Sequence, residues 1–273
     1  MAVYLGSNSV TLTKAVVSKP KGYGREILFR TISGSFSRDI DSIGDFAFAG
    51  CSALTSVSFP TCTSIGNSAF CFCSALTSIS FPVCTSIESY AFYGCSALTY
   101  VNFPNCTSIG TSAFGNCYHL SSISFPVCTY IEGYAFYYCF HLSSISFPVC
   151  TSIEGSAFFG CSGSALTSVS FPACTNIGSS TFNRCYNLSS VFLPVCTSIG
   201  SYAFYSCYNL ISLNLAEVSS VPTLGTGAFT STPIGGYSTS AGQYGSVYVP
   251  SSLYNDFLIA PNWSSISSRI LSM

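Results

Sequence analysis

The sequence predicts an elongated solenoid, in which the chain winds into stacked coils and short strands of successive coils lie side by side in a parallel β-sheet. Three observations support this fold class: a repeat of 22 residues, an apolar pattern shared by the repeats, and cysteines at two constant places in the repeat. The isoleucine of the recurring "SIG" marks the period at Ile43, Ile65, Ile87, Ile109, Ile131, Ile153, Ile177 and Ile199, followed by Val221. Every step is 22 residues except one of 24, where "CSGSAL" replaces "CSAL".

Each repeat contains one strand and one turn. The segment "LTSVSFPTCTSI" carries its apolar residues at Leu54, Val57, Phe59, Cys62 and Ile65. The alternation Val57-Ser58-Phe59 has the two-residue period of a strand with one buried face, and Pro60 ends that strand because proline donates no hydrogen bond to a sheet. In "GNSAFCFC", which follows, the spacing of Ala, Phe and Cys suits a short helical turn. One repeat cannot bury its own apolar edge, so the repeats must stack into one continuous core.

These residues resemble the repeats of the leucine-rich repeat family and, more narrowly, the BspA-like repeats of bacterial surface proteins, whose units have the form L-x-x-I-x-L-P…x-x-I-G-x-x-A-F-x-x-C. Eight units over about residues 41–230 match at nearly every apolar position. The resemblance implies a leucine-rich repeat solenoid of mostly β structure, with the parallel sheet on its concave face and short helical turns on its convex side. About nine coils, at roughly 4.8 Å for each parallel strand, would span roughly 40 Å. Phenylalanine replaces the family's leucine at Phe59, Phe81, Phe103, Phe125, Phe147 and Phe171.

Fifteen of the 16 cysteines hold repeat positions. Eight follow the "AF" turn, at Cys51, Cys73, Cys95, Cys117, Cys139, Cys161, Cys185 and Cys207, and seven follow the strand, at Cys62, Cys84, Cys106, Cys128, Cys150, Cys174 and Cys196. We interpret both rows as buried free thiols that fill the core, with no disulfides expected. Disulfides between neighbouring coils are the alternative, although side chains that stack in register point in parallel rather than at each other. Cys71 lies outside both rows and is the one candidate reactive thiol.

The composition excludes several classes of protein. Charged residues make up 6% of the chain, against about 25% in an ordinary soluble domain. Polar residues interrupt every apolar stretch, so we expect no membrane insertion. The first twenty residues lack a basic region followed by an apolar one, so no secretory signal peptide is visible; either it was removed or the protein leaves its cell in another way, for instance in a phage particle or by lysis.

Both ends depart from the repeat, which predicts three parts: an N-terminal cap or attachment segment at 1–40, the solenoid at 41–230, and a C-terminal cap at 231–273. Six of the eight basic residues lie in the first part, at Lys14, Lys19, Lys21, Arg25, Arg30 and Arg38. They suit a solvated cap or an attachment surface for an acidic partner, and few aromatic residues lie among them, which argues against nucleic acid. In the last part, "SVYVPSSLYNDFLIAPNW" predicts a strand, a proline and a short helix capped by serine and limited by Pro261.

The search for chemistry predicts no enzyme, no cofactor and no metal site. His119 and His141 share one repeat position and should stack, either as a surface pair, which we favour, or as a two-histidine metal site or pH-sensitive patch. Glu132 and Glu154 replace glycine on consecutive coils, which suits a solvated edge or a weak cation site. The chain contains neither a G-x-S-x-G motif nor a phosphate-binding loop.

The predicted surface is more informative. The outward positions of the strands are mostly serine, and four residues interrupt this hydroxyl surface: Tyr100, Asn102, Phe192 and Asn214. They are candidate ligand-binding residues of the concave face, because aromatic residues dominate binding hot spots; neutral drift is the alternative. Aromatic residues also gather at the convex turns, and the candidates for an assembly surface are Tyr93, Tyr137, Tyr138, Phe140, Tyr205 and Tyr208.

Two functions of different classes fit these features. The first is a non-enzymatic adhesion scaffold, extracellular or at a bacterial surface, that binds a protein or glycan of a host or neighbouring cell. The second is a structural component, either of a phage tail or fibre or of a self-assembling surface filament, whose partners are copies of itself. The first rests on analogy at the level of the fold, whereas the low charge and the opening "YLGSNSV" favour the second.

Overall fold

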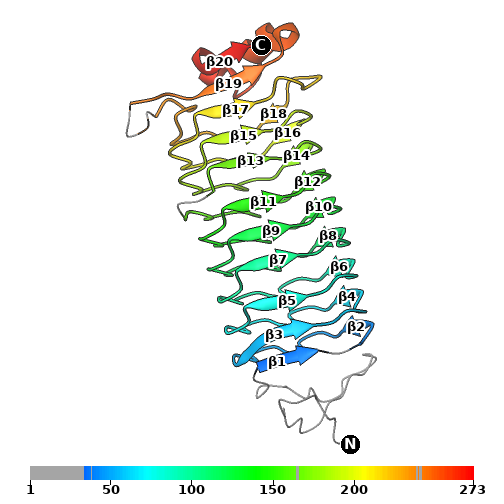
Figure 1. Ribbon diagram of the computed structural model, residues 1–273. Coiled ribbons are helices and arrows are strands. Elements are labelled where there is room, and N and C mark those ends of the chain that lie inside the picture. The colour runs from blue at the N-terminus through cyan, green and yellow to red at the C-terminus, as the bar shows by residue number, and fades with distance from the viewer. Residues whose placement is uncertain (1–33, 38, 164–165, 238, 240–241) are drawn as a thin grey trace, which may run out of the picture.

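In the computed structural model the chain forms a stack of coils that runs the length of the molecule (Figure 1). The structure describes residues 34–37, 39–163, 166–237, 239 and 242–273. The six basic residues of the N-terminal segment lie outside the described residues. Among the described residues, no helix is long and apolar enough to cross a membrane.

One side of the stack is a nine-stranded parallel sheet, counted within the described residues, of two-residue strands. Its strands are β2 (Ser42–Ile43), β4 (Ser64–Ile65), β6 (Ser86–Ile87), β8 (Ser108–Ile109), β10 (Tyr130–Ile131), β12 (Ser152–Ile153), β14 (Asn176–Ile177), β16 (Ser198–Ile199) and β18 (Thr223–Leu224). The isoleucines pair in register and are buried, as the period predicts. The period places Val221 at the ninth isoleucine position, and this prediction is wrong: the residue that pairs with Ile199 is Leu224. Leu224 precedes a glycine, in "TLG", as the sheet isoleucine does in "SIG", whereas Val221 precedes a proline, in "SVP".

A second side, the long-strand face, carries the strands expected from the alternating pattern. These are β1 (Gly34–Ser37), β3 (Leu54–Ser58), β5 (Ser78–Ser80), β7 (Tyr100–Asn102), β9 (Ser122–Ser124), β11 (Ser144–Ser146), β13 (Ser168–Ser170), β15 (Ser190–Phe192), β17 (Ser212–Asn214), β19 (Ser246–Val249) and β20 (Ile270–Ser272). They form three parallel sheets in the orders β1-β3-β5, β11-β9-β7 and β13-β15-β17-β19-β20. The break between β11 and β13 coincides with the one repeat that is two residues longer.

The "AF" segments fold as short overlapping turns and do not extend into a helix. In the second repeat, N–H groups donate to carbonyl groups three residues back, from Ala69 to Gly66 (3.2 Å) and from Cys73 to Phe70 (3.1 Å). The N–H of Phe70 instead donates to the carbonyl of Ala91 on the next coil, at 2.7 Å. In a helix all of these N–H groups would point along the helix axis, so the hydrogen bonds to the next coil would be lost. The turns require left-handed residues at two places, with φ of 53° at Ser68 and 59° at Phe72.

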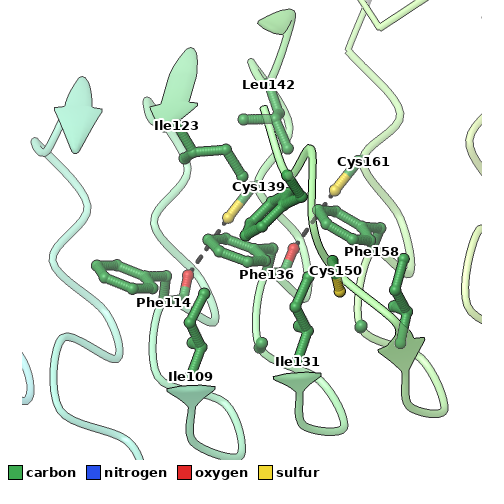
Figure 2. Packing of buried hydrophobic residues seen from close by; sticks show 14 of the residues in the cluster. Ile109, Phe114, Ile123, Ile131, Phe136, Cys139, Leu142, Cys150, Phe158 and Cys161 are labelled. Atoms are coloured by element: carbon green, nitrogen blue, oxygen red, sulfur yellow. Dashed lines mark hydrogen bonds between the residues drawn. The ribbon is translucent and has the colours of Figure 1, made fainter. Parts of the chain in front are cut away.

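The core between these faces consists of stacked columns of identical side chains. Phe114 and Phe136 stack with ring centroids 5.4 Å apart, and Phe136 meets Phe125 of the neighbouring column edge-on at 6.2 Å. Figure 2 shows the cysteines of the turn row among these rings, where Cys139 Sγ donates to the carbonyl of Phe114 at 3.3 Å. All fifteen repeat cysteines are buried, and burial raises the pKa of the Cys139 thiol well above its usual range. They therefore act as small apolar fillers. Thiols of the turn row from Cys73 onward donate to a backbone carbonyl of the preceding coil, whereas thiols of the strand row donate to the carbonyl two residues further along their own coil, as Cys62 does to Ser64.

The C-terminal segment covers the last coil. It contains β19, the 3₁₀ helices η1 (Ser251–Leu253) and η2 (Ser264–Arg269), helix α1 (Tyr254–Ile259) between them, and β20. Trp263 is fully buried, and its Nε1 donates to the carbonyl of Pro222 at 2.7 Å. The predicted strand, proline and short helix are present, but the serine cap is wrong: η1 starts after Pro250 and α1 after Leu253, with no side-chain cap at either. The serines instead form the 3₁₀ turn that leads into α1.

Candidate functional site

Departures from the repeat gather at one place on the solenoid, at the corner between the nine-stranded sheet and the "AF" turns. The second residue after the sheet isoleucine carries a side chain in seven coils, at Asp45, Asn67, Ser89, Thr111, Ser179, Ser201 and Thr226. The two consecutive coils between Thr111 and Ser179 have Gly133 and Gly155 at this position. The missing side chains leave an open hollow of about 480 Å³, lined by Thr111, Tyr130, Glu132, Gly133, Tyr134, Glu154, Gly155 and Ser179. We call these eight residues the glycine hollow.

Three more side chains of the glycine hollow replace the usual residue of their repeat position: Tyr130 stands where most coils have serine, and Glu132 and Glu154 stand where six coils have glycine. Tyr134 holds a position that is aromatic in four coils and serine in four. Tyr130 and Tyr134 are exposed by 39% and 48%. The hollow therefore combines two accessible aromatic rings with two acidic groups.

Hydrogen bonds hold the two carboxylates of the hollow. Glu132 Oε2 accepts from both the N–H (2.8 Å) and the hydroxyl (2.6 Å) of Thr111, on the coil before. Glu154 Oε1 accepts from the Ser152 hydroxyl at 3.2 Å. The pKa of Tyr130 is raised, first by partial burial and then by the charge of Glu154 and a hydrogen bond to Glu154. The Tyr130 phenol therefore lies beside the Glu154 carboxylate. Both carboxylates thus keep a fixed position while retaining further acceptor capacity toward the hollow.

The glycine hollow was only partly foreseen. Glu132 and Glu154 were singled out as substitutions for glycine, but Tyr130, Tyr134 and the two glycines were not. Comparing every repeat position down the stack reveals them, because all of these departures fall within two coils.

The candidate residues of the long-strand face form two separate groups. Tyr100, 52% exposed, and Asn102 belong to β7. Phe192 on β15 is directly paired with Asn214 on β17. Four strand spacings separate β7 from β15, about 19 Å at roughly 4.8 Å each. The structure therefore brings Phe192 and Asn214 together but places Tyr100 and Asn102 elsewhere on the face.

The predicted assembly aromatics are mostly half-buried against one another. Tyr138 packs against Tyr137 (4.1 Å between centroids) and Phe140 (5.2 Å), and Tyr208, 46% exposed, stacks on Tyr186. Tyr93 accepts a hydrogen bond at its hydroxyl from Asn116, and Tyr205 meets Tyr202 edge-on. The exposed aromatic residues of this face include Phe72, at the second left-handed position of its turn, and four residues at the first left-handed position: Phe46, Tyr90, Tyr134 and Tyr202.

The two histidines stack as expected. Their ring centroids are 5.2 Å apart, and each Nδ1 lies 2.7 Å from a backbone carbonyl, of Ser96 for His119 and of Tyr118 for His141. In the part of the chain that the structure describes, no three His, Cys, Asp or Glu side chains are grouped so as to hold a metal ion.

A protein-family model matches most of the chain. The model of the BspA type leucine rich repeat region, in six copies, matches residues 30–139 and 129–241. The chain belongs to the BspA-type leucine-rich repeat family. The glycine hollow and all four candidate residues of the long-strand face lie within its BspA-type repeats.

Solved structures of bacterial proteins share this BspA-type fold. The leucine-rich repeat protein of T. pallidum is similar with a TM-score of 0.54 and 27% identity, over 70% of this chain and 80% of that one. A leucine-rich cell surface protein of Faecalibacterium prausnitzii is similar with a TM-score of 0.53 and 25% identity, over 73% of this chain and 67% of that one. No curated protein sequence matches the chain. Repeats of this family are generally non-catalytic binding scaffolds.

Proposed function

We propose that this BspA-type protein is a non-enzymatic binding scaffold that recognises a glycan or protein at a bacterial surface. The observation that carries the proposal is the glycine hollow, where five residues at three repeat positions depart from the usual residue within two adjacent coils: Tyr130, Glu132, Gly133, Glu154 and Gly155. In a repeat protein most of the stability comes from the inward residues of each coil and from the contacts between neighbouring coils. Outward departures that meet in one concavity therefore favour recognition of a ligand over packing. The cell surface protein of F. prausnitzii, similar in fold, supports the location.

Binding to intact cells tests this function. Fluorescently labelled protein is incubated with bacterial and mammalian cells over a range of concentrations, and bound fluorescence is measured by flow cytometry. We expect saturable binding to at least one cell type, competed by unlabelled protein. Binding that is absent, or that rises linearly without saturation on every cell type, would contradict the proposal.

A second function, a structural part of a phage tail or fibre or of a surface filament, has one observation in its favour. The strand β20 is the outermost strand of its sheet, and Ile259, Leu271 and Met273 beside it are exposed by 81%, 45% and 66%. An open edge with apolar neighbours can pair with another chain. Size-exclusion chromatography with light scattering, followed by negative-stain microscopy, separates the two functions: the scaffold is expected as a monomer, whereas regular filaments or defined trimers would favour the structural part.

A further inference from the structure

We propose that the glycine hollow binds one ring of a neutral carbohydrate. This inference deepens the proposed function and rests on it. Four properties of the hollow support it: its shape, its aromatic side chains, its hydrogen-bonding groups and its charge.

The shape comes from backbone that no side chain covers. Gly133 and Gly155 lie side by side on consecutive coils, and a Cβ on Gly133 would approach the carbonyl oxygen of Gly155 to 3.1 Å. Thr111 and Ser179 carry side chains at the equivalent positions of the coils before and after. The hollow is therefore two coils wide, about 10 Å at roughly 4.8 Å for each coil, which admits a pyranose ring.

The aromatic residues supply an apolar surface at the right place. Tyr130 and Tyr134 flank Glu132 on a single coil, two residues before and two residues after it, and both rings are partly exposed to solvent. The C–H groups of a sugar ring pack against a tyrosine ring, while the phenol oxygen can still accept hydrogen bonds from sugar hydroxyls. Tyr134 is held at φ 60° by the turn, so its backbone is fixed before any ligand arrives.

The carboxylates supply hydrogen-bond acceptors. Glu132 and Glu154 are at the same repeat position of adjacent coils, and their carboxylates are held at different points of the hollow, by Thr111 of the preceding coil and by Ser152. Each ionised carboxylate accepts several O–H donors and donates none. Because Thr111 already orients the Glu132 carboxylate with two hydrogen bonds, the loss of side-chain entropy on binding is small.

The charge selects among sugars. No lining residue is basic, and the only basic side chains of the described residues contact aromatic rings elsewhere: Arg184 over Phe159 and Arg269 over Tyr244. Two carboxylates without a cation repel sialic and uronic acids. A neutral, hydroxyl-rich ring satisfies the acceptors without that repulsion. A lysine side chain of a partner protein is the competing ligand, because it needs the charge of the hollow but not its shape.

The direct test is isothermal titration calorimetry with neutral oligosaccharides derived from glucose, mannose, xylose, galactose and N-acetylglucosamine, beside a lysine-rich peptide. Three variants introduce residues that other coils carry at the same repeat position: Tyr134→Ser, Glu132→Gly, and the double variant Gly133→Ser/Gly155→Ser, which fills the hollow. Serine already occupies the position of Tyr134 in four coils with φ between 53° and 59°, so this variant is expected to fold. Tyr90→Ser, at the same repeat position outside the hollow, is the matched control.

The expected result is binding of at least one neutral oligosaccharide, weakened at least tenfold by each of the three variants, unchanged by Tyr90→Ser, and little affected by salt. Sugar binding that survives the double glycine variant would place the sugar elsewhere and overturn the inference. Preference for the lysine-rich peptide, with binding that falls steeply as salt rises, would also overturn it. Folding of each variant is verified by circular dichroism.

The same variants on cells separate this inference from the proposed function. If cell binding is lost after periodate oxidation of the cell-surface glycans and after Tyr134→Ser, both stand. If cell binding is saturable but resists periodate and the three variants, the scaffold function stands and the carbohydrate site is excluded. If neither cells nor oligosaccharides bind, both fall.

Discussion

The ring of Phe72 lies over Gly94 of the next coil, where a Cβ would stand 2.6 Å from Cδ1 of the ring. Both residues hold the second left-handed position of their turns, with φ of 59° and 72°. Tyr202 covers Gly227 in a similar way. Large aromatic side chains at the turns therefore depend on small neighbours in the following coil.

This relationship predicts the cost of adding one methyl group. Gly94→Ala combines the strain of a left-handed alanine, about 1 kcal/mol, with displacement of Phe72 from its edge-on contact with Tyr93. Gly50→Ala is the matched control, because φ is 74° but nothing lies within 4 Å of its Cβ. We expect Gly94→Ala to destabilise by about 1 kcal/mol more than Gly50→Ala, measured by urea unfolding. Adding Phe72→Ala should remove this excess, and an equal loss in both single variants would contradict the contact.

The left-handed positions also predict a stabilising change. Ser206 is buried with φ 59°, a conformation that costs a non-glycine residue roughly 1–2 kcal/mol. Ser206→Gly removes this strain but increases the entropy of the unfolded chain, so we expect a net gain of about 0.5–1 kcal/mol. Ser206→Ala retains the strain and should show no gain. Thermal unfolding of both variants decides between strain and side-chain packing as the cause.

The 22-residue repeat predicts which side chains are buried, because residues at the same repeat position face the same side of every coil. Leu54, Phe59 and Ile65 occupy inward positions of the repeat, and all three are fully buried. The turns were predicted less well, because the local spacing of "AF" favours a helix whereas bonds to the next coil favour left-handed residues such as Phe72. Such residues are intrinsically disfavoured, so neighbouring coils decide their conformation.

The candidate site could be predicted only in part for a similar reason. Tyr100 and Phe192 were found because each is a large residue among serines along one strand. The glycine hollow depends on what is absent from two adjacent coils, Gly133 and Gly155, together with Tyr130 and Tyr134 around them. Its concavity exists only when the coils are stacked, so no single repeat indicates it.

The buried thiols predict sensitivity to alkali. Burial raises the pKa of Cys128 and of Cys196 to about 11, whereas a thiol in the unfolded chain has a pKa of about 8.5. Below pH 8.5 both states are protonated and this stability is fully present. As the pH rises toward 11, the unfolded state loses protons first, so the free energy of unfolding falls by up to about 1.4 kcal/mol per pH unit for each such cysteine.

Urea unfolding between pH 8 and pH 10.5 measures this loss. Cys128→Ala leaves a small cavity at every pH, so the slope of stability against pH is compared, not the absolute value. We expect a shallower slope for the variant than for the native chain. Identical slopes would show that Cys128 does not control the alkaline transition. Rapid labelling of more than one thiol of the native protein at pH 8 would show that the repeat thiols are not buried, because only Cys71 is partly exposed.

The long-strand face offers the last prediction. Phe192 pairs with Ser170 on one side and Asn214 on the other, and Tyr100 pairs with Ser122. Serine is the usual outward residue of these strands, so Tyr100→Ser and Phe192→Ser should change stability by no more than about 0.5 kcal/mol. If a ligand uses this face, each variant weakens cell binding, and the two effects add because the residues are too far apart to share a partner. Unchanged binding in the double variant, with loss in Tyr134→Ser, would exclude this face and assign recognition to the corner of the solenoid.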